Sequence, residues 1–207
     1  MSQQMRSEIS EDSELIKQKI SDLVRHAAEE RIRLHTQLDE FRIVDDDRGF
    51  VPGQVLGNQM ALILVSGDAI RITLKLHFSL SEIKPLIYAI YGLDSPNDVR
   101  DEQAIDFGKE LCNLIAGYVV QMLEENGLPV GISLPLCTRG FYEIFADYRP
   151  LQKPIIKYCD LWRLQYGETS IYGTAMVEVL NPALLEPLLS YETGSDDSDD
   201  SGEFDFL

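Results

Sequence analysis

The sequence has few basic residues for its length. Lys and Arg together number 18 in 207 residues, against 35 Asp and Glu, and the formal net charge is -17 at pH 7. Affinity for nucleic acid comes largely from cations that neutralise phosphates, and this chain offers no basic stripe to do so. We therefore expect no nucleic-acid partner.

Cysteine and long apolar runs are scarce as well. The three cysteines, Cys112, Cys137 and Cys159, form no Cys-x-x-Cys and have no His pair nearby, which disfavours a disulfide framework and a zinc site. The first residues are polar and acidic, and no window approaches the roughly 18 apolar residues of a membrane span. We predict a cytoplasmic protein with no membrane insertion.

The motifs of several common enzyme classes are missing. The sequence contains no glycine-rich phosphate loop, no G-x-S-x-G and no Cys/His pairing at nucleophile spacing. Three adjacent acids, Asp45, Asp46 and Asp47, lack the spacing with which metal loops make their carboxylates converge. We expect this chain to bind no metal and no cofactor of its own.

The apolar residues that are present predict one sizeable domain. They make up 44% of the chain and recur at helical spacing from Leu15 to about residue 30, which indicates a helix. Residues 31–41 fit a continuation of that helix, but RIRLH also alternates like a strand, and both alternatives stay open.

From Met60 to Phe78 the apolar pattern changes to period two, interrupted by a turn at SGD, which predicts an antiparallel hairpin with one wet face. His77 falls on the polar side, so we expect it to be exposed to solvent. Ser79 and Glu82 have the spacing of a capping box for the next helix, which Gly92 would end.

Asp98 is the expected cap of a long helix over residues 99–125. Beyond it, VGISLPLC reads as a strand, FYEIFADYRP as irregular, PIIKYCDLWRLQYG and SIYGTAMVEVL as two long strands, and PALLEPLLSY as a short helix. This order predicts an α+β fold, with an antiparallel or mixed sheet packed against long helices.

We divide the chain into three parts. Residues 1–48 form an N-terminal helical segment and loop, residues 49–191 a globular domain, and residues 192–207 an acidic, disordered tail. The tail is either a solubility device or, because it ends in EFDFL, a docking peptide.

The helix of residues 99–125 carries a narrow stripe of polar residues and glycine at about 100° per residue. The stripe consists of Gln103, Asp106, Glu110, Asn113, Gly117, Gln121 and Glu124. A wet helix face explains most of it, but Asn113 is a mediocre helix former in mid-helix, and Gly117 costs about 1 kcal/mol relative to Ala. A glycine leaves room for another chain to come close, so the stripe looks built for contact.

Here the sequence resembles a family. Asp106, Glu110 and Asn113, followed at once by LIAG, look like the helix signature of the CheC/CheX/FliY chemotaxis phosphatases, in which Ser or Asp, then Glu, then Asn precede an apolar pair and Ala-Gly. The likeness extends over roughly residues 55–180, which makes residues 49–191 a CheX-like domain. A single copy of the motif points to the CheX branch, because CheC-type members usually carry two.

The resemblance implies an activity. Family members hydrolyse the phospho-aspartate of a CheY-like response regulator, whose own Mg²⁺ polarises the acyl phosphate. By that likeness Asn113 would place the attacking water, Glu110 would pair with the regulator's active-site lysine, and Asp106 and Gly117 would contact the partner. No metal or cofactor is required of the present chain.

Two alternatives remain beside this hypothesis. A domain with the same fold and stripe could bind a receiver domain or a chemotaxis component without hydrolysis, and a flagellar-switch role is a third reading. The resemblance also implies a homodimer paired through sheet edges, for which the strands near residues 154–180 are candidates. A second Glu-x-x-Asn, Glu178 to Asn181, runs from a predicted strand into Pro182 and is interpreted as accidental.

Overall fold

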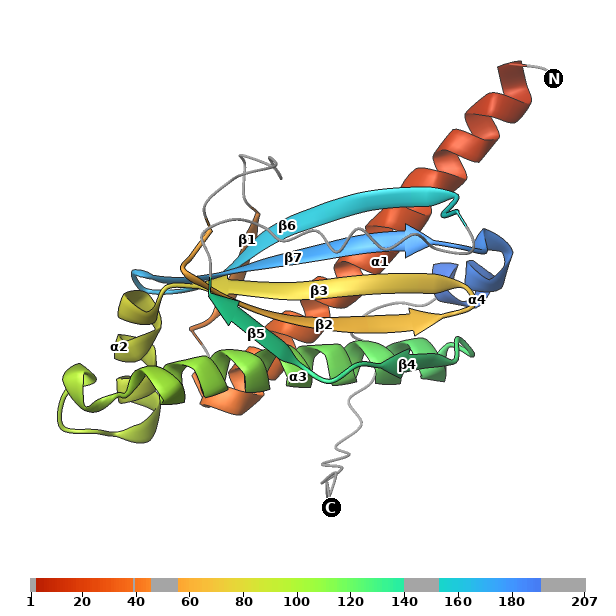
Figure 1. Ribbon diagram of the computed structural model, residues 1–207. Coiled ribbons are helices and arrows are strands. Elements are labelled where there is room, and N and C mark those ends of the chain that lie inside the picture. Colours follow the sequence, from red (N-terminus) through yellow and green to blue (C-terminus); the bar gives the residue numbers. More distant parts are fainter. Residues whose placement is uncertain (1–2, 39, 46–55, 140–152, 191–207) are drawn as a thin grey trace.

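The protein folds as one antiparallel sheet with two long helices packed together on it (Figure 1). The computed structural model describes residues 3–38, 40–45, 56–139 and 153–190. Its helices are α1 (Gln3–Thr36), α2 (Leu80–Tyr91), α3 (Asp101–Glu125) and α4 (Glu186–Leu189). The strands are β1 (Arg42–Asp45), β2 (Gln59–Gly67), β3 (Ile70–Phe78), β4 (Val130–Ile132), β5 (Leu136–Arg139), β6 (Ile156–Tyr166) and β7 (Thr169–Val179).

The strand order is β1-β6-β7-β3-β2-β4, with β5 also paired to β2, and each pair of neighbours is antiparallel. The predicted α+β class, the hairpin and the two long strands are confirmed. Strand β1 pairs with β6 only at Trp162 to Gln165, so it covers part of the candidate edge near residues 154–180. Among the described residues, Ile156 to Leu161 of β6 have no second strand beside them. The opposite edge of the sheet is formed by β4 and β5, and the homodimer stays a prediction.

Helix α1 settles the open question about residues 31–41: it continues through RIRLH but ends at Thr36, before Phe41. The apolar residues on one face of α1, including Ile20, Val24, Ala27 and Ile32, are fully buried and belong to the same core as the sheet and α3. RIRLH is helical despite its strand-like alternation, because Ile32 continues the buried face of the helix that packs on the core.

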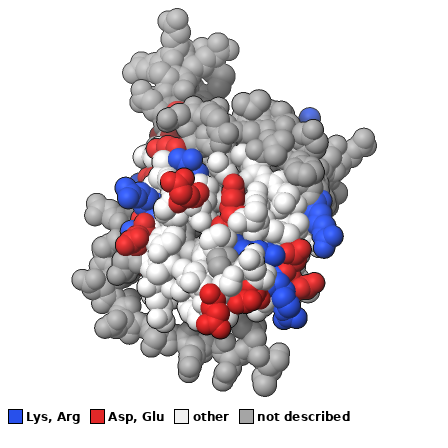
Figure 2. Space-filling model, turned by 90° about the vertical axis from the view of Figure 1, so that its left-hand side faces the viewer, with Lys and Arg blue, Asp and Glu red and all other residues white. Residues whose placement is uncertain are grey.

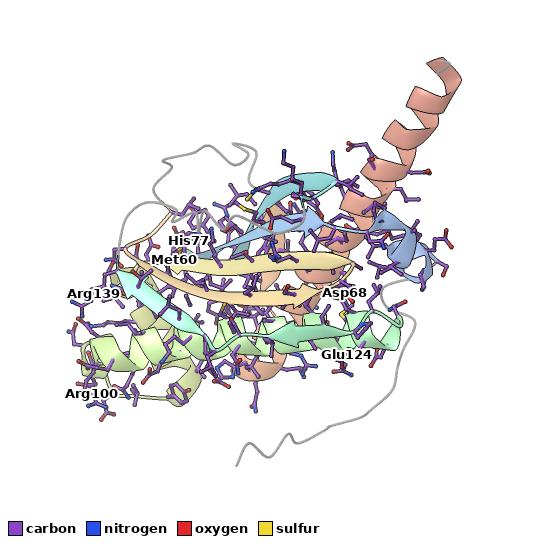
Figure 3. The ribbon with its side chains drawn as sticks, turned by 45° about the vertical axis from the view of Figure 1, so that its right-hand side comes forward. Met60, Asp68, His77, Arg100, Glu124 and Arg139 are labelled. Atoms are coloured by element: carbon purple, nitrogen blue, oxygen red, sulfur yellow. The ribbon has the colours of Figure 1, made fainter. Side chains whose placement is uncertain are left out.

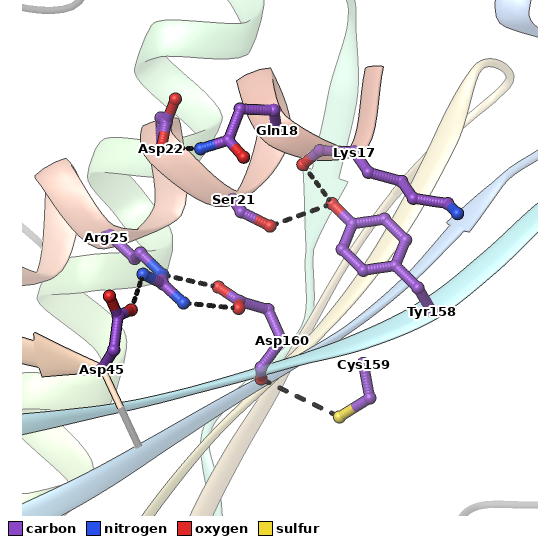
Figure 4. Close-up of polar contacts among 9 residues, drawn as sticks. All are labelled: Lys17, Gln18, Ser21, Asp22, Arg25, Asp45, Tyr158, Cys159 and Asp160. Carbon is purple, nitrogen blue, oxygen red and sulfur yellow. Dashed lines mark hydrogen bonds and ion pairs between the residues drawn. The ribbon is translucent and has the colours of Figure 1, made fainter. Parts of the chain in front are cut away.

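A polar cluster fastens α1 to the sheet (Figure 4). The Arg25 guanidinium donates to both carboxylate oxygens of Asp160 on β6, at 2.8 and 2.7 Å, and also pairs with Asp45 of β1. The Tyr158 hydroxyl donates to the backbone carbonyl of Lys17 at 2.9 Å. These contacts raise the pKa of Arg25, chiefly through its hydrogen bonds to Asp160.

Replacing Asp160 by Ala should lower the free energy of unfolding by about 1–3 kcal/mol, because it leaves a half-buried guanidinium with one partner fewer. The Asp160 side chain is only 12% exposed. Glu14, whose side chain is 69% exposed and pairs with Lys17, is the control, and Glu14→Gln should change stability by less than about 0.5 kcal/mol. Equal losses in denaturant unfolding of the two variants would show that the cluster does not anchor α1.

The prediction of an exposed His77 is wrong. Its ring is 4% exposed and its Nε2 lies 3.3 Å from the Thr174 hydroxyl. Strand β3 lies between β2 and β7, so His77 is flanked by its cross-strand partners Met60 and Tyr172. Figure 3 shows Met60 and His77 side by side. Neighbours on both sides, which the alternation of one strand does not reveal, remove this polar face from water.

Two predicted helix caps are also wrong. Ser79 occupies the N-cap position of α2 but makes no side-chain cap; instead the Asn58 side-chain carbonyl accepts from the Leu80 amide at 3.3 Å. Asp98 belongs to a short 3₁₀ helix (Pro96–Asp98), and α3 begins after Arg100, whose amide donates to Gln103 at 3.0 Å. The predicted end of α2 at Gly92 is confirmed, with φ of 58°.

The chain beyond α3 follows the predicted order, with one refinement. VGISLPLC is divided into β4 and β5, and PALLEPLLSY forms a 3₁₀ turn (Pro182–Leu185) followed by α4. FYEIFADYRP, Asp46, Asp47 and the acidic tail lie outside the described residues. The structure does not test the domain boundaries at residues 48 and 191, which stay predictions.

Candidate functional site

Helix α3 presents the polar stripe to solvent along its whole length, from Arg100 to Glu124 in Figure 3. Asp106, Glu110 and Gly117 are exposed and Asn113 is half-buried. The opposite face packs into the core through Phe107, Leu111, Ile115, Val119 and Met122, each no more than 4% exposed. The predicted division of the helix into two faces is therefore confirmed.

The stripe is engaged at its ends and free at its centre. Near its start Gln103 accepts from Arg100, and Asp106 pairs with Lys109 at 3.6 Å. Near its end Gln121 donates to Glu125 at 2.9 Å. Among the residues that the structure describes, the Glu110 carboxylate and the Asn113 amide have neither a hydrogen-bond nor an ion-pair partner.

Gly117 completes this free centre. A Cβ built at Gly117 would meet nothing within 4 Å, so its surroundings are open. Glu110, Asn113 and Gly117 follow one another at three- and four-residue spacing, which places their Cα atoms on one helix face. The centre of the stripe thus offers a carboxylate, an amide and bare backbone that no described part of the molecule uses.

The other glycine of α3 fixes the helix on the sheet. A Cβ at Gly108 would overlap the ring of Phe78, which is 1% exposed at the end of β3. Gly108 therefore lets α3 lie directly against that ring. Because the contact is one turn before Cys112 and Asn113, it sets the height at which the stripe stands above the sheet.

A groove of about 710 Å³ begins at Glu110 and runs toward the start of α3. Its lining comes from four elements that are distant in sequence: His35, Tyr91, Leu93, Gln103, Asp106, Phe107, Lys109, Glu110 and Pro135. Asn113 and Gly117 are not part of the lining; they follow Glu110 on the same face of α3, toward its C-terminal end. The structure thus brings Asp106 and Glu110 into the groove and leaves Asn113 outside it.

His35, at the end of α1, is the neighbour of Glu110 that the sequence did not reveal. Its ring lies 5.2 Å from the Phe107 ring, centroid to centroid. Burial lowers the pKa of His35 below its ordinary value of 6.5, and the charge of Glu110 opposes that shift. No local motif signals this neighbour, because the packing of α1 on α3 brings the two together.

Glu110→Gln should lower the pKa of His35 further, because it removes the negative charge that favours the imidazolium. An NMR titration of the ring in wild type and variant measures this. Glu124→Gln, at the far end of the stripe, is the control, and an unchanged pKa in Glu110→Gln would contradict the contact. Between its lowered folded pKa and 6.5 the unfolded chain binds more protons at His35, so its contribution to stability rises with pH across that window.

The second Glu-x-x-Asn lies on strand β7, as predicted, and does not present a helical pair. Glu178 pairs with Arg71 at 3.0 Å and with Lys157 at 3.1 Å on the sheet surface. Asn181 follows the end of the strand. The Glu178 carboxylate is thus already committed to two cations.

The described residues form neither a metal site nor a reactive-cysteine site. Within the described ranges, no three His, Cys, Asp or Glu side chains gather as a metal site, and no helix there is long and apolar enough to cross a membrane. Cys112 on α3 is buried, and its burial raises the pKa of the thiol, so it is a poor nucleophile at neutral pH.

Comparison of the sequence with protein-family models and with curated proteins finds no match. Solved structures do share the fold. A CheC-like superfamily protein from Shewanella sp. PV-4 has a TM-score of 0.62 and 14% identity, with 77% of this chain and 97% of that chain covered. CheX from Desulfovibrio desulfuricans has a TM-score of 0.57 and 13% identity, with 77% and 99% covered.

A CheX-CheY-BeF3-Mg²⁺ complex from Borrelia burgdorferi also matches through its CheX-like fold, with a TM-score of 0.54, 12% identity, and 76% of this chain and 96% of that chain covered. At these identities the likeness establishes architecture. The chain has the CheC/CheX-like fold, as the helix motif predicted.

Proposed function

We propose that this protein hydrolyses the phospho-aspartate of a CheY-like response regulator, using the Glu110 and Asn113 pair of α3. The observation that carries the proposal is the free centre of the stripe: an exposed carboxylate and a half-buried amide one turn apart, neither with a hydrogen-bond or ion-pair partner among the described residues. The CheC/CheX-like fold supports it, since a CheX of that fold has been solved in a CheY-BeF3-Mg²⁺ complex.

In the proposed reaction a water attacks the phosphorus of the acyl phosphate, and the bond between phosphorus and the aspartate oxygen breaks. The products are the free carboxylate and inorganic phosphate, which keeps the proton lost by the water. Asn113 accepts a hydrogen bond from the water and donates one to a phosphoryl oxygen, because an amide has both functions. Its contribution is positioning, which dominates phosphoryl transfer.

Glu110 has a different part in the proposal. One turn before Asn113, it meets the regulator's active-site lysine, docks the helix and draws that cation from the phosphate. Asp106 and Gly117 flank the pair, Asp106 as a further polar contact and Gly117 as a place where the partner's backbone lies close. Mg²⁺ is expected in the regulator, where it polarises the acyl phosphate, and the two proteins would meet in the cytoplasm.

The test is turnover. Each receiver domain of the same cell is phosphorylated with a small acyl phosphate, and its decay is followed with this protein at one tenth of the regulator concentration. The proposal expects complete loss of the phosphoryl group at a rate proportional to the protein added. Binding to a receiver domain with unchanged decay would instead identify a non-catalytic adaptor, and no effect on any receiver domain would contradict both readings.

A further inference from the structure

We propose that residues 133–136, which connect β4 to β5 and include the first residue of β5, form a rigid apolar wall that docks the same response regulator beside its active-site lysine. This inference rests on the proposed function and adds a second contact surface to the Glu110 and Asn113 pair. Its occupant is the rim of the receiver domain, where apolar side chains would flank the lysine that Glu110 meets.

A β-bulge builds the wall. Ile132 pairs with Val65 and Leu136 with Leu62, so β4 and β5 have one residue more than β2 between these two points. Ser133 holds the irregular backbone in place: its amide donates to the Leu64 carbonyl at 2.9 Å, and its hydroxyl accepts from the Leu64 amide at 3.0 Å. Bulges of this kind turn side chains away from the regular sheet.

The bulge turns apolar side chains out to solvent. Leu134 is 89% exposed, against 44 to 67% for the other exposed large apolar residues described. Leu136, which follows, is 58% exposed. A single exposed leucine needs no explanation, but these two stand on a backbone fixed by two hydrogen bonds, next to a groove.

The wall is continuous with the groove at the stripe. Pro135, between the two leucines, lines the groove together with Asp106 and Glu110. The ribbon shows β4 and β5 running beside α3 (Figure 1). A partner that sits in the groove over Glu110 therefore meets Pro135, and Leu134 and Leu136 are its neighbours in the chain.

The charged residues of the groove indicate which group of the partner would bind there. The groove holds two carboxylates, Asp106 and Glu110, and one ammonium group, Lys109, which pairs with Asp106. The lowered pKa of His35 leaves that ring neutral at pH 7, so the Glu110 charge is not balanced by a described side chain. Figure 2, which faces the end of the molecule with α2 and the start of α3, shows acidic and basic groups interspersed around an uncharged area. The surface fits a cation set among apolar side chains.

The experiment compares Leu134→Ser with Ile155→Ser. Ile155 is 67% exposed and precedes β6, four strand positions from β4 in the sheet, so it is a matched control for the loss of an exposed apolar side chain. Both variants should fold as the wild type does. Binding is measured to the receiver domain that gave turnover, loaded with beryllofluoride and Mg²⁺, and KM and kcat are measured with its phosphorylated form.

We expect Leu134→Ser to raise Kd and KM about tenfold, the effect of losing one buried anchor of an interface, with kcat and the control unchanged. Wild-type affinity in Leu134→Ser would overturn this inference and leave the proposed function standing. Loss of self-association in place of regulator binding would assign the wall to a second copy of the chain and overturn it too. Failure of the wild type to bind any receiver domain would overturn both proposals.

Discussion

Asn113→Ala is expected to abolish the acceleration of phospho-regulator decay while leaving affinity for the regulator within about twofold of wild type. The side-chain amide is the group that orients the attacking water in the proposed reaction, and alanine offers neither its donor nor its acceptor. Removing one positioned polar group from a phosphoryl or acyl transfer site costs about 10²- to 10³-fold in rate. Decay of the labelled regulator measures the first effect and beryllofluoride-dependent binding the second.

Gln121→Ala is the matched control, because Gln121 is exposed on the same stripe but its amide is held by Glu125 at 2.9 Å. It should hydrolyse as fast as the wild type. Loss of helix stability does not confound the comparison, since alanine is a better helix former than asparagine and Asn113 makes no hydrogen bond to another described residue. Normal decay rates in Asn113→Ala would remove Asn113 from the reaction.

The two glycines of α3 should respond to alanine with opposite signs. At Gly108 the new methyl group would overlap the buried ring of Phe78, so we expect a net loss of about 2 kcal/mol of unfolding free energy, the usual cost of overpacking. At Gly117 nothing lies within 4 Å of the new Cβ, and the variant should gain up to about 1 kcal/mol from helix propensity. Thermal or denaturant unfolding measures both.

Gly117→Ala should raise stability but weaken binding of the regulator. The more stable Gly117→Ala is expected to bind the regulator about fivefold or more weakly, because its methyl group enters the space reserved for the partner. Gln121→Ala serves as the control for binding too, since Gln121 is exposed one turn further along the same helix face and its amide is held by Glu125. Undiminished binding by Gly117→Ala would mean that no partner approaches the helix closely there.

Local patterns predicted the elements that carry the site. The hairpin of β2 and β3, the two faces of α3 and the turn at Gly92 each depend on periodicity or on one backbone conformation, which neighbouring residues determine. The motif of Glu110 and Asn113 was legible for the same reason, because three-residue spacing on a helix needs no tertiary information.

What the sequence missed depends on contacts between distant segments. His77 was expected in water, but β2 and β7 on either side of it bury the ring. The strands near residues 154–180 were candidates for a sheet edge, and β1 covers part of that edge, at Trp162 to Gln165, through a pairing with β6 that no spacing reveals. The prediction of the α2 cap was wrong for a similar reason, since the Asn58 side chain accepts the hydrogen bond that was expected to go to Ser79.

The groove shows the same limit at the site itself. Asp106 and Glu110 were predicted, whereas His35, Tyr91 and Pro135 join them only through the packing of α1, α2 and the segment between β4 and β5 around α3. The bulge at Ser133 was also hidden, because VGISLPLC reads as one continuous strand. Long-range packing therefore supplied the shape of the site and local patterning supplied its polar groups.

The most direct test of the central claim is a crystal structure of this protein with its receiver domain in the beryllofluoride and Mg²⁺ form. The account predicts that α3 enters the regulator's active site, with the Asn113 amide about 3 Å from the beryllofluoride or its in-line water and Glu110 on the regulator's lysine. A regulator bound elsewhere on the surface, with Glu110 and Asn113 facing solvent, would contradict it.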